Sequence, residues 1–401
     1  MRSLTLFEDQ RLTLSKSIQL TGESLRQYLP NYRHIAIAYS GGKDSTATVT
    51  VICHLIETGQ IPKPESLTVL YADTRQELPP LQLCATQVLR VLENRGIKTR
   101  IVLPEMDKRF LPYILGRGVP PPNNTTLRWC TRQIKLDPMA AALNDLKKCL
   151  DPGERLLMLT GVRQGESAVR DQRISLSCSK NGAECGQGWF QSMTTPQTDT
   201  LAPILHWRVC HVWEWLWLHA PALGFDTTLL AEAYGAEEAE EINARTGCVG
   251  CPLASKDTAL DALIKQPQWA YLAPLKRLRT IYGELRRFNN RLQKDGSETR
   301  KDGSLVSNPM RKGPITLEAR EWALQEILKI QEIVNDSAMR EGRPTISLIN
   351  PEEELFIRDC IANRVWPNGW NGDEPRGDAL LPEVLKDGSI QGLLFGEEVF
   401  A

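Results

Sequence analysis

The sequence predicts an α/β fold with a doubly wound, mostly parallel sheet and a helical region towards the C-terminus. Short apolar runs of strand length alternate with longer apolar segments of helix length in the N-terminal part of the chain. A turn with two adjacent glycines joins the first run to the first long segment. The 401 residues, 41% hydrophobic and 24% charged, suffice for two or three folded domains of about 150 residues each.

Four apolar runs have the length and composition of buried strands: residues 34–39, 67–72, 99–103 and 156–160. Crossover helices are expected between them, at residues 46–55, 81–95 and 138–149. Strands that alternate with helices pair in parallel, and the ligand of such a sheet lies at the carboxyl ends of its strands. The glycine turn after the first strand is therefore the expected place of a binding site.

The rest of the chain is expected to follow this domain in separate blocks. The proline- and glycine-rich residues 116–124 are expected to form a loop beside the site. Residues 260–289 and 317–334 have helical patterns, separated by a polar stretch at 294–313. The expected organisation is a helical lead-in at 1–29, the α/β domain at 30–256, a helical basic region at 257–345 and a tail at 346–401.

Charge and hydropathy exclude several classes of function. With 48 basic and 49 acidic side chains the net charge is −1, so no overall field attracts nucleic acid or an anionic membrane. No apolar run approaches the ~20 residues that span a bilayer, and the first residues become acidic too early for a signal peptide. The protein is expected in the cytoplasm with no membrane partner, where its ten cysteines are thiols, metal ligands or catalysts.

Residues 40–45, Ser-Gly-Gly-Lys-Asp-Ser, follow the first expected strand and open the first helix. Such a turn leaves backbone N–H groups able to bind an anion, and the helix start adds partial positive charge. A Walker A loop is excluded, because it would need glycine in place of Ile37 and a hydroxyl in place of Asp44. A plain capped turn is the alternative, but it would need neither the flanking hydroxyls nor the lysine.

This motif resembles the PP-loop of the ATP pyrophosphatase and phosphoadenylyl-sulfate (PAPS) reductase superfamily, whose fold is adenine nucleotide alpha hydrolase-like. Two segments after later strands, Asp73-Thr74 and residues 161–167, resemble the same superfamily. The resemblance implies that ATP is split between its α- and β-phosphates, with Mg²⁺, and that Lys43, Asp44 and Arg163 are catalytic. The implied nucleotide-binding set is Ser40, Gly41, Gly42, Lys43, Asp44, Ser45, Asp73, Thr74, Gly161 and Arg163.

Cys248 and Cys251 stand at a spacing that can hold one metal ion or one cluster. A zinc ribbon would need a second such pair, which the sequence lacks. With Cys130 and Cys185 they form a set of four thiolates for a [4Fe–4S] cluster, and Cys178 is the reserve for Cys185. Basic residues around Cys130 are expected to lower the pKa of its thiol. Four thiols without metal are the alternative, and three further cysteines are expected in the core: Cys53, Cys84 and Cys149.

Residues 69–79, 117–118, 128–131 and 247–251 together resemble the DNA phosphorothioation sulfurtransferases of the DndC and SspD type. The resemblance implies ATP-dependent replacement of a non-bridging oxygen of a DNA phosphate by sulfur. It also implies a [4Fe–4S] cluster, a cysteine desulfurase as sulfur donor, and other phosphorothioation-system proteins as partners. ATP would adenylate the phosphate, pyrophosphate would leave into the PP-loop, and sulfur would displace AMP.

A basic surface for DNA is expected at residues 276–312, which hold eleven Lys or Arg against four Asp or Glu. Trp269, Tyr271, Tyr282 and Phe288, in or near this stretch, are suited to stack on bases. The alternative is a solvated helix face with buried aromatic side chains. The five histidines show no metal or nucleophile spacing and are expected to be structural.

Three other functions stay open. Glu184-Cys185-Gly186 resembles the nucleophile segment of the PAPS and adenylyl-sulfate reductases, and sulfite release from PAPS would select that activity. A tRNA thiolase shares the loop and often a cluster, and preferential binding of tRNA would select it. Nucleotide binding without conversion of ATP to AMP and pyrophosphate would indicate a sensor within a defence complex.

Overall fold

The computed structural model describes residues 12–124, 127–165, 172, 189–192, 198–235, 247–299, 303, 306, 308–367, 369–385 and 389–391. The chain forms two compact units that are interleaved along the sequence. The first comprises residues 1–73, 77–103 and 135–247, and the second comprises residues 74–76, 104–134 and 248–401. The four consecutive domains expected from the sequence remain a prediction. Compactness instead divides the chain into these two interleaved units.

The first unit is built on a six-stranded sheet with the order β3-β2-β1-β4-β6-β5. Strands β3, β2, β1, β4 and β6 are parallel, and β5 pairs antiparallel with β6 at one edge. The predicted mostly parallel sheet is therefore confirmed. The strands are β1 His34–Tyr39, β2 Ser66–Ala72, β3 Lys98–Val102, β4 Leu156–Leu159, β5 Trp189–Ser192 and β6 Thr198–Ala202.

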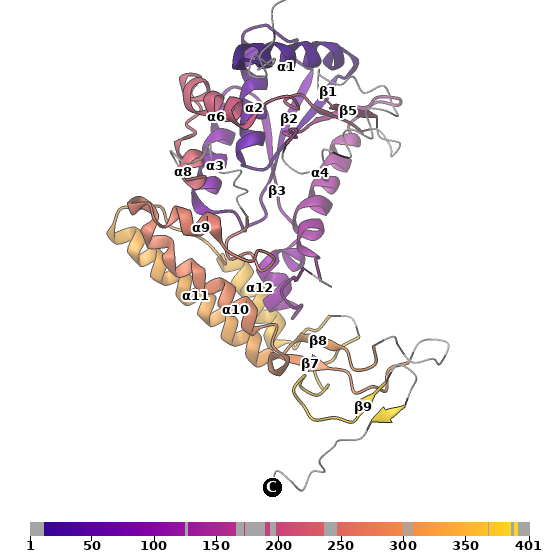
Figure 1. Ribbon diagram of the computed structural model, residues 1–401. Helices are drawn as coiled ribbons and strands as arrows, with labels where there is room; N and C mark the ends of the chain where they lie inside the picture. The colour runs from indigo at the N-terminus through magenta and orange to yellow at the C-terminus, as the bar shows by residue number, and fades with distance from the viewer. Residues whose placement is uncertain are drawn as a thin grey trace, which may run out of the picture. The chain divides into compact units, whose positions relative to one another are not determined.

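Helices cover both faces of this sheet (Figure 1). The crossover helices predicted from the sequence are present as α2 Lys43–Glu57, α3 Pro79–Asn94 and α4 Asp137–Lys147. In Figure 1, α2 and α3 lie on one face and α4 lies on the other, where Ala142 packs against buried residues of the strands such as Leu70. The remaining helical segments of this unit are α1 Leu14–Tyr28, η1 Leu29–Asn31, α6 Val209–Glu214, η5 Trp215–His219, α7 Ala220–Ala222 and α8 Thr228–Ala233.

The central strand β1 sets the position of the site. Its sequence, His-Ile-Ala-Ile-Ala-Tyr, is almost continuously apolar because helices cover it from both sides. It pairs with β2 on one edge and with β4 on the other. The winding of the chain reverses between β1 and β4, and the carboxyl ends of strands at such a switch point leave room for a ligand.

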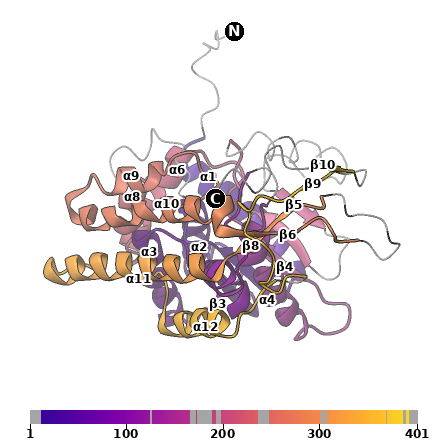
Figure 2. The same ribbon diagram turned by 90° about the horizontal axis from the view of Figure 1, so that it is seen from below.

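The second unit is mainly helical, with two small antiparallel strand pairs. Figures 1 and 2 show α10 running beside α11, the longest helix of the described residues. Its α-helices are α9 Thr258–Leu263, α10 Arg277–Glu284, α11 Leu317–Arg340 and α12 Pro351–Ala362. Its shorter helical segments are η2 Met106–Lys108, η3 Pro112–Gly116, η7 Pro267–Lys276 and η8 Phe288–Asn290, and η4 Arg132–Leu136 spans the boundary of the two units along the chain. Its strands are β7 Arg291–Gln293, β8 Lys312–Ile315, β9 Glu383–Val384 and β10 Ile390–Gln391.

Two parts of this unit differ from the sequence-based expectation. Residues 260–289 do not form one continuous helix, because Pro267 and Pro274 lack an N–H group and interrupt α-helical bonding, so a 3₁₀ segment separates α9 from α10. The expected tail contains α12, whose capping box joins the side chains of Asn350 and Glu353 to the helix start. The described residues contain no helix with the length and hydropathy needed to cross a membrane.

Candidate nucleotide-binding site

The loop at residues 40–45 lies at the switch point, between the end of β1 and the start of α2. Gly41 has a φ of +73°, and a Cβ at this position would lie 3.3 Å from the Cβ of Ala85, so both the turn and its packing favour glycine. Helix α2 begins after Gly42 without a side-chain cap. The Lys43 N–H donates to the Tyr234 hydroxyl at 3.4 Å, and the first turn of α2 can offer its other N–H groups and its partial positive charge to an anion.

The two serines of the motif face each other across the loop. The Ser40 N–H donates to Ser45 Oγ at 3.2 Å, and the two hydroxyl oxygens lie 3.1 Å apart. Ser45 Oγ also lies 3.0 Å from the carbonyl oxygen of Gly42. These bonds hold the loop in one conformation, which lowers the entropic cost of ordering it around a ligand.

Two buried cations meet at the start of α2. Lys43 Nζ lies 3.0 Å from Asp44 Oδ2, and Arg163 Nε lies 2.5 Å from Asp44 Oδ1. Lys43 is 7% exposed and Arg163 is 4% exposed. Burial acts to raise the pKa of the Asp44 carboxyl, but Arg163 and then Lys43 outweigh it and hold that pKa below its usual range. The site thus combines a helix start with two positive side chains, the requirements of a pyrophosphate group.

Gly161 brings the loop after β4 against the phosphate loop. A Cβ at Gly161 would lie 2.9 Å from backbone atoms of Asp44 and Ser45, so a larger residue does not fit. This close approach lets Arg163, two residues later, reach the Asp44 carboxylate. The structure therefore brings together the two segments that the sequence placed in one site.

Asp73 follows β2 at the same edge of the sheet and is 9% exposed. Its N–H donates to the Val102 carbonyl at 3.1 Å. The next residue, Thr74, is 4% exposed and is counted with the second unit. Asp73 and Thr74 thus continue the edge that carries the loop, and their roles with nucleotide stay a proposal.

Sequence reasoning missed Glu353, a buried carboxylate of the second unit. Its Oε2 lies 3.3 Å from Arg75 Nη2 and its Oε1 lies 3.1 Å from Arg109 Nη1. Arg75, which has a φ of 61°, comes directly after Thr74. The Asn350–Glu353 capping pattern could have located this carboxylate, but not its arginine partners.

The structure places three of the predicted cluster ligands in the second unit. Cys130, Cys248 and Cys251 are free thiols of intermediate exposure. The Cys251 N–H donates to the Cys248 carbonyl at 3.1 Å, and Gly250 between them has a φ of +62°. Besides burial, Cys251 raises the pKa of Cys130, and Cys248 and Cys251 both raise the pKa of the buried Tyr282. These groups therefore lie close to one another.

The structure corrects two predictions about the cysteines and does not describe two of the predicted ligands. The pKa of Cys130 is raised by burial, not lowered by its basic neighbours, so that expectation is wrong. Cys53 and Cys84 are buried as expected, but Cys149 is exposed because α4 ends before it. Cys178 and Cys185 lie outside the described residues, among which no three His, Cys, Asp or Glu side chains are placed to hold a metal ion.

The basic stretch 276–312 is largely paired within the second unit. Ion pairs join Lys276 to Asp261 and Arg277 to Glu326. The prediction that aromatic side chains here stack on bases is wrong for three of them, because they are buried: Trp269, Tyr271 and Tyr282. Phe288 is 59% exposed, with Lys312 Nζ 4.9 Å from its ring centroid.

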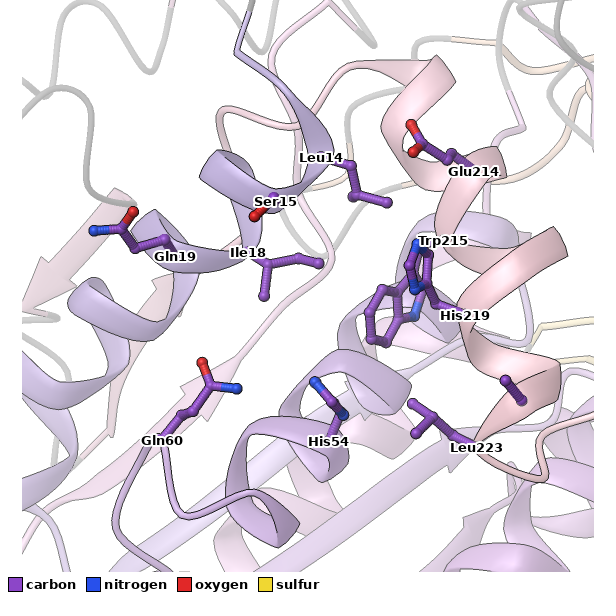
Figure 3. A pocket seen from close by; sticks show the side chains of 11 residues that line it. Leu14, Ser15, Ile18, Gln19, His54, Gln60, Glu214, Trp215, His219 and Leu223 are labelled. Carbon is purple, nitrogen blue, oxygen red and sulfur yellow. The ribbon is translucent and has the colours of Figure 1, made fainter.

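A groove of about 580 Å³ lies in the first unit, at the end of α2 remote from the phosphate loop (Figure 3). His54, Trp215 and His219 lie close together along it, and the His219 ring stacks on Trp215 with centroids 5.4 Å apart. His211 instead accepts the Arg208 N–H at 3.2 Å and caps α6. The groove holds none of the predicted site residues.

The fold and the loop geometry define a PP-loop domain that uses a nucleotide. Residues 34–223 match the phosphoadenosine phosphosulfate reductase domain, so this part of the chain is similar to that family. Its members are enzymes, and the expectation of an enzyme is confirmed.

The chain is also similar to individual proteins. It is 25% identical over 220 residues to an uncharacterized protein of Methanocaldococcus jannaschii, spanning 55% of this chain and 42% of that protein's length. The PAPS reductase of Candida auris, solved with phosphate, has 13% identity and a TM-score of 0.32, covering 51% of this chain and 86% of that one. The U34-tRNA thiolase NcsA of Methanococcus maripaludis, solved with its [4Fe–4S] cluster, has 18% identity and a TM-score of 0.33, covering 68% and 79%. Similarity at this level carries no information on the substrate of this protein.

Proposed function

We propose that this protein is an ATP pyrophosphatase and sulfurtransferase that adenylates a phosphate of the DNA backbone for sulfur insertion. The observation that carries the ATP chemistry is the buried Lys43–Asp44–Arg163 cluster at the uncapped start of α2. The DNA substrate rests on the resemblance of the cysteine and strand-end motifs to the phosphorothioation sulfurtransferases.

In the first step a non-bridging oxygen of the phosphodiester attacks the α-phosphorus of ATP. The bond to the β-phosphate breaks, and negative charge develops on the departing pyrophosphate. Lys43, Arg163 and the N–H groups of α2 are already oriented in a buried setting, so they stabilise this charge without reorganisation. Asp44 keeps the two cations in place, and Mg²⁺ bound with the nucleotide neutralises further charge.

In the second step a sulfur nucleophile attacks the adenylated phosphorus and AMP leaves. The activating oxygen departs with AMP, so one ATP and one hydrosulfide give one phosphorothioate, AMP and pyrophosphate. A cysteine desulfurase partner would supply the sulfur as a persulfide, and a thiol reductant would release it as hydrosulfide while forming a disulfide. Other phosphorothioation-system proteins would present the DNA.

The [4Fe–4S] cluster is proposed from the resemblance alone, with Cys130, Cys185, Cys248 and Cys251 as its ligands and Cys178 as the reserve for Cys185. Of these, the described Cys130, Cys248 and Cys251 are not placed to hold a metal ion. Thiolates are the ligands of such clusters. When bound, the cluster would supply an iron site that can hold sulfide.

Exchange of labelled pyrophosphate into ATP tests the first step without any sulfur donor. The wild-type protein should catalyse the exchange when duplex or single-stranded DNA is added, and Lys43→Met and Arg163→Met should abolish it. Arg33→Ala is the matched control, because Arg33 is an exposed cation that directly precedes β1 and pairs with Glu65. DNA-independent or absent exchange would contradict the proposal.

The match to the PAPS reductase domain favours a second candidate, a reductase of PAPS. The same preparation should therefore be incubated with labelled PAPS and with tRNA. Sulfite release from PAPS would select the reductase, and exchange that depends on tRNA alone would select a thiolase. Phosphorothioate dinucleotides in nuclease-digested DNA, found only when the gene is intact, would support the DNA reaction.

A further inference from the structure

The hydroxyl group of Tyr234 lies beside the phosphate loop, although this residue stands 191 positions after Lys43 in the chain. Its oxygen accepts the Lys43 N–H at 3.4 Å. A Cβ at Gly42 would lie 3.4 Å from the same oxygen and 3.8 Å from Ser40 Oγ. The phenol oxygen is therefore next to the N–H groups that the loop and the start of α2 can offer to a pyrophosphate group.

The ring of Tyr234 contacts the cation of the same site. Lys43 Nζ lies 5.2 Å from the centroid of the ring, which is within the distance of about 6 Å at which the face of an aromatic ring attracts a cation. Asp44 binds the same ammonium group at 3.0 Å. Tyr234 thus touches both the backbone N–H and the side chain of Lys43.

Packing within the first unit fixes Tyr234 in this position. The residue directly follows α8 and is 6% exposed. Its ring meets the fully buried Trp213 ring edge to face, with the centroids 5.3 Å apart, and Trp213 stacks on Trp217. A hydroxyl group on a ring that is already held loses little entropy when it binds a ligand.

The hydrogen bond between the Lys43 N–H and Tyr234 can be exchanged for bonds to a phosphate. It is longer than the usual N–H···O range of about 2.7–3.2 Å, so it is weak. A phosphate oxygen is the stronger acceptor, because its charge strengthens the bond. A phenol can donate as well as accept. Tyr234 can therefore release the Lys43 N–H to a phosphate oxygen and donate its own O–H to that oxygen.

We infer that Tyr234 joins Lys43 and Arg163 in binding the pyrophosphate group, by donating its O–H to a phosphate oxygen and holding Lys43 in position with its ring. This inference rests on the pyrophosphate site of the proposed function, but not on the DNA substrate. Negative charge grows on the pyrophosphate as it departs, so the hydrogen bond strengthens and favours cleavage as well as binding.

The test measures the affinity for inorganic pyrophosphate with Mg²⁺ by isothermal titration calorimetry on the full chain. Tyr234→Phe removes only the hydroxyl group and should bind pyrophosphate roughly 10–100-fold more weakly, the effect of one lost hydrogen bond to a charged group. Its Tm without ligand should stay close to that of the wild type, because the bond it loses is long. Tyr234→Leu also removes the ring and should bind pyrophosphate more weakly still.

Tyr32→Phe is the matched control. It also removes a phenol hydroxyl group from the first unit, where Tyr32 donates to Asp199 at 2.7 Å. Tyr32 precedes β1, whereas the phosphate loop follows this strand. The control should bind pyrophosphate as the wild type does.

Wild-type affinity in Tyr234→Phe would overturn the inference, whether or not its Tm falls, and would leave Tyr234 a purely structural residue. Tighter binding would also overturn it, because the hydroxyl group would then compete with the phosphate. If Tyr234→Leu fails to fold, Tyr234→Phe decides alone. A wild-type protein that does not bind pyrophosphate would overturn this inference and the phosphate site together. Pyrophosphate binding that depends on the Tyr234 hydroxyl, without DNA-dependent exchange, would support the inference and contradict only the DNA reaction.

Discussion

Replacing Gly161 by alanine tests the geometry that joins the two halves of the nucleotide site. The new methyl group would stand 2.9 Å from backbone atoms of Asp44 and Ser45, whereas ordinary contact begins at 3.4 Å. Backbone cannot rotate away as a flexible side chain can, so the loop after β4 must move out by about 0.5 Å. Overpacking of this kind costs about 1–3 kcal/mol of unfolding free energy, which corresponds to a loss of roughly 2–10 °C in Tm.

The same movement withdraws Arg163 from the phosphate site. A misplacement of 1 Å costs about 100-fold in rate, so a displacement of about 0.5 Å should lower kcat/KM of pyrophosphate exchange about tenfold. The control is Gly22→Ala in α1, where the nearest atom is the flexible end of the Arg26 side chain at 3.3 Å. This variant should keep wild-type activity and a Tm within a few degrees. Wild-type Tm and exchange rate in Gly161→Ala would refute the close packing described here.

Three further changes test other contacts of the two units. Asp44→Ala leaves two buried cations without their carboxylate, so it should abolish turnover and cost about 3–5 kcal/mol of unfolding free energy. In thermal unfolding, added pyrophosphate should restore part of this loss. Retained turnover would show that Asp44 does not belong to the site. Burial lowers the pKa of His211 below its usual 6.5, so its contribution to stability is complete above pH 6.5 and declines below it, by at most about 1.4 kcal/mol per pH unit. His211→Asn keeps an acceptor for the Arg208 N–H but cannot titrate, so its unfolding free energy in urea should fall less steeply below pH 6.5. The same pH dependence in this variant and in the wild type would contradict the prediction. Glu353→Gln should cost about 2–4 kcal/mol in urea unfolding, because it leaves two arginine side chains without their shared buried carboxylate; a loss below about 0.5 kcal/mol would show that these pairs do not stabilise the unit.

The sheet and its crossover helices were predictable because their signals are local. A run such as Ile35–Ile37 is apolar at successive positions, which only a strand covered on both faces requires. The phosphate loop was predictable for the same reason, since Gly41 and Gly42 sit between that strand and the helix that follows. Helix α12 was missed, because residues 346–401 were expected to form a tail, although the capping box at Asn350 is a local signal of a helix start.

The electrostatic expectations failed where they depended on distant partners. The pKa of Cys130 follows from its burial rather than from the basic residues near it in sequence. The positive charge of residues 276–312 is largely consumed by partners such as Asp261 and Glu326, which lie well outside that stretch. Charge counted along a sequence takes no account of pairing, so it overestimates the charge available to a ligand.

The amino-acid sequence by itself determined the alternation of strands and helices and the phosphate loop at residues 40–45, because hydrophobic periodicity and glycine conformation act over a few residues. Only the tertiary structure decided that Gly161 presses on Ser45 and that Asp44 holds both Lys43 and Arg163. These features join segments far apart in the chain, and their existence depends on which loops and helix ends the fold brings together, a property that no local pattern encodes.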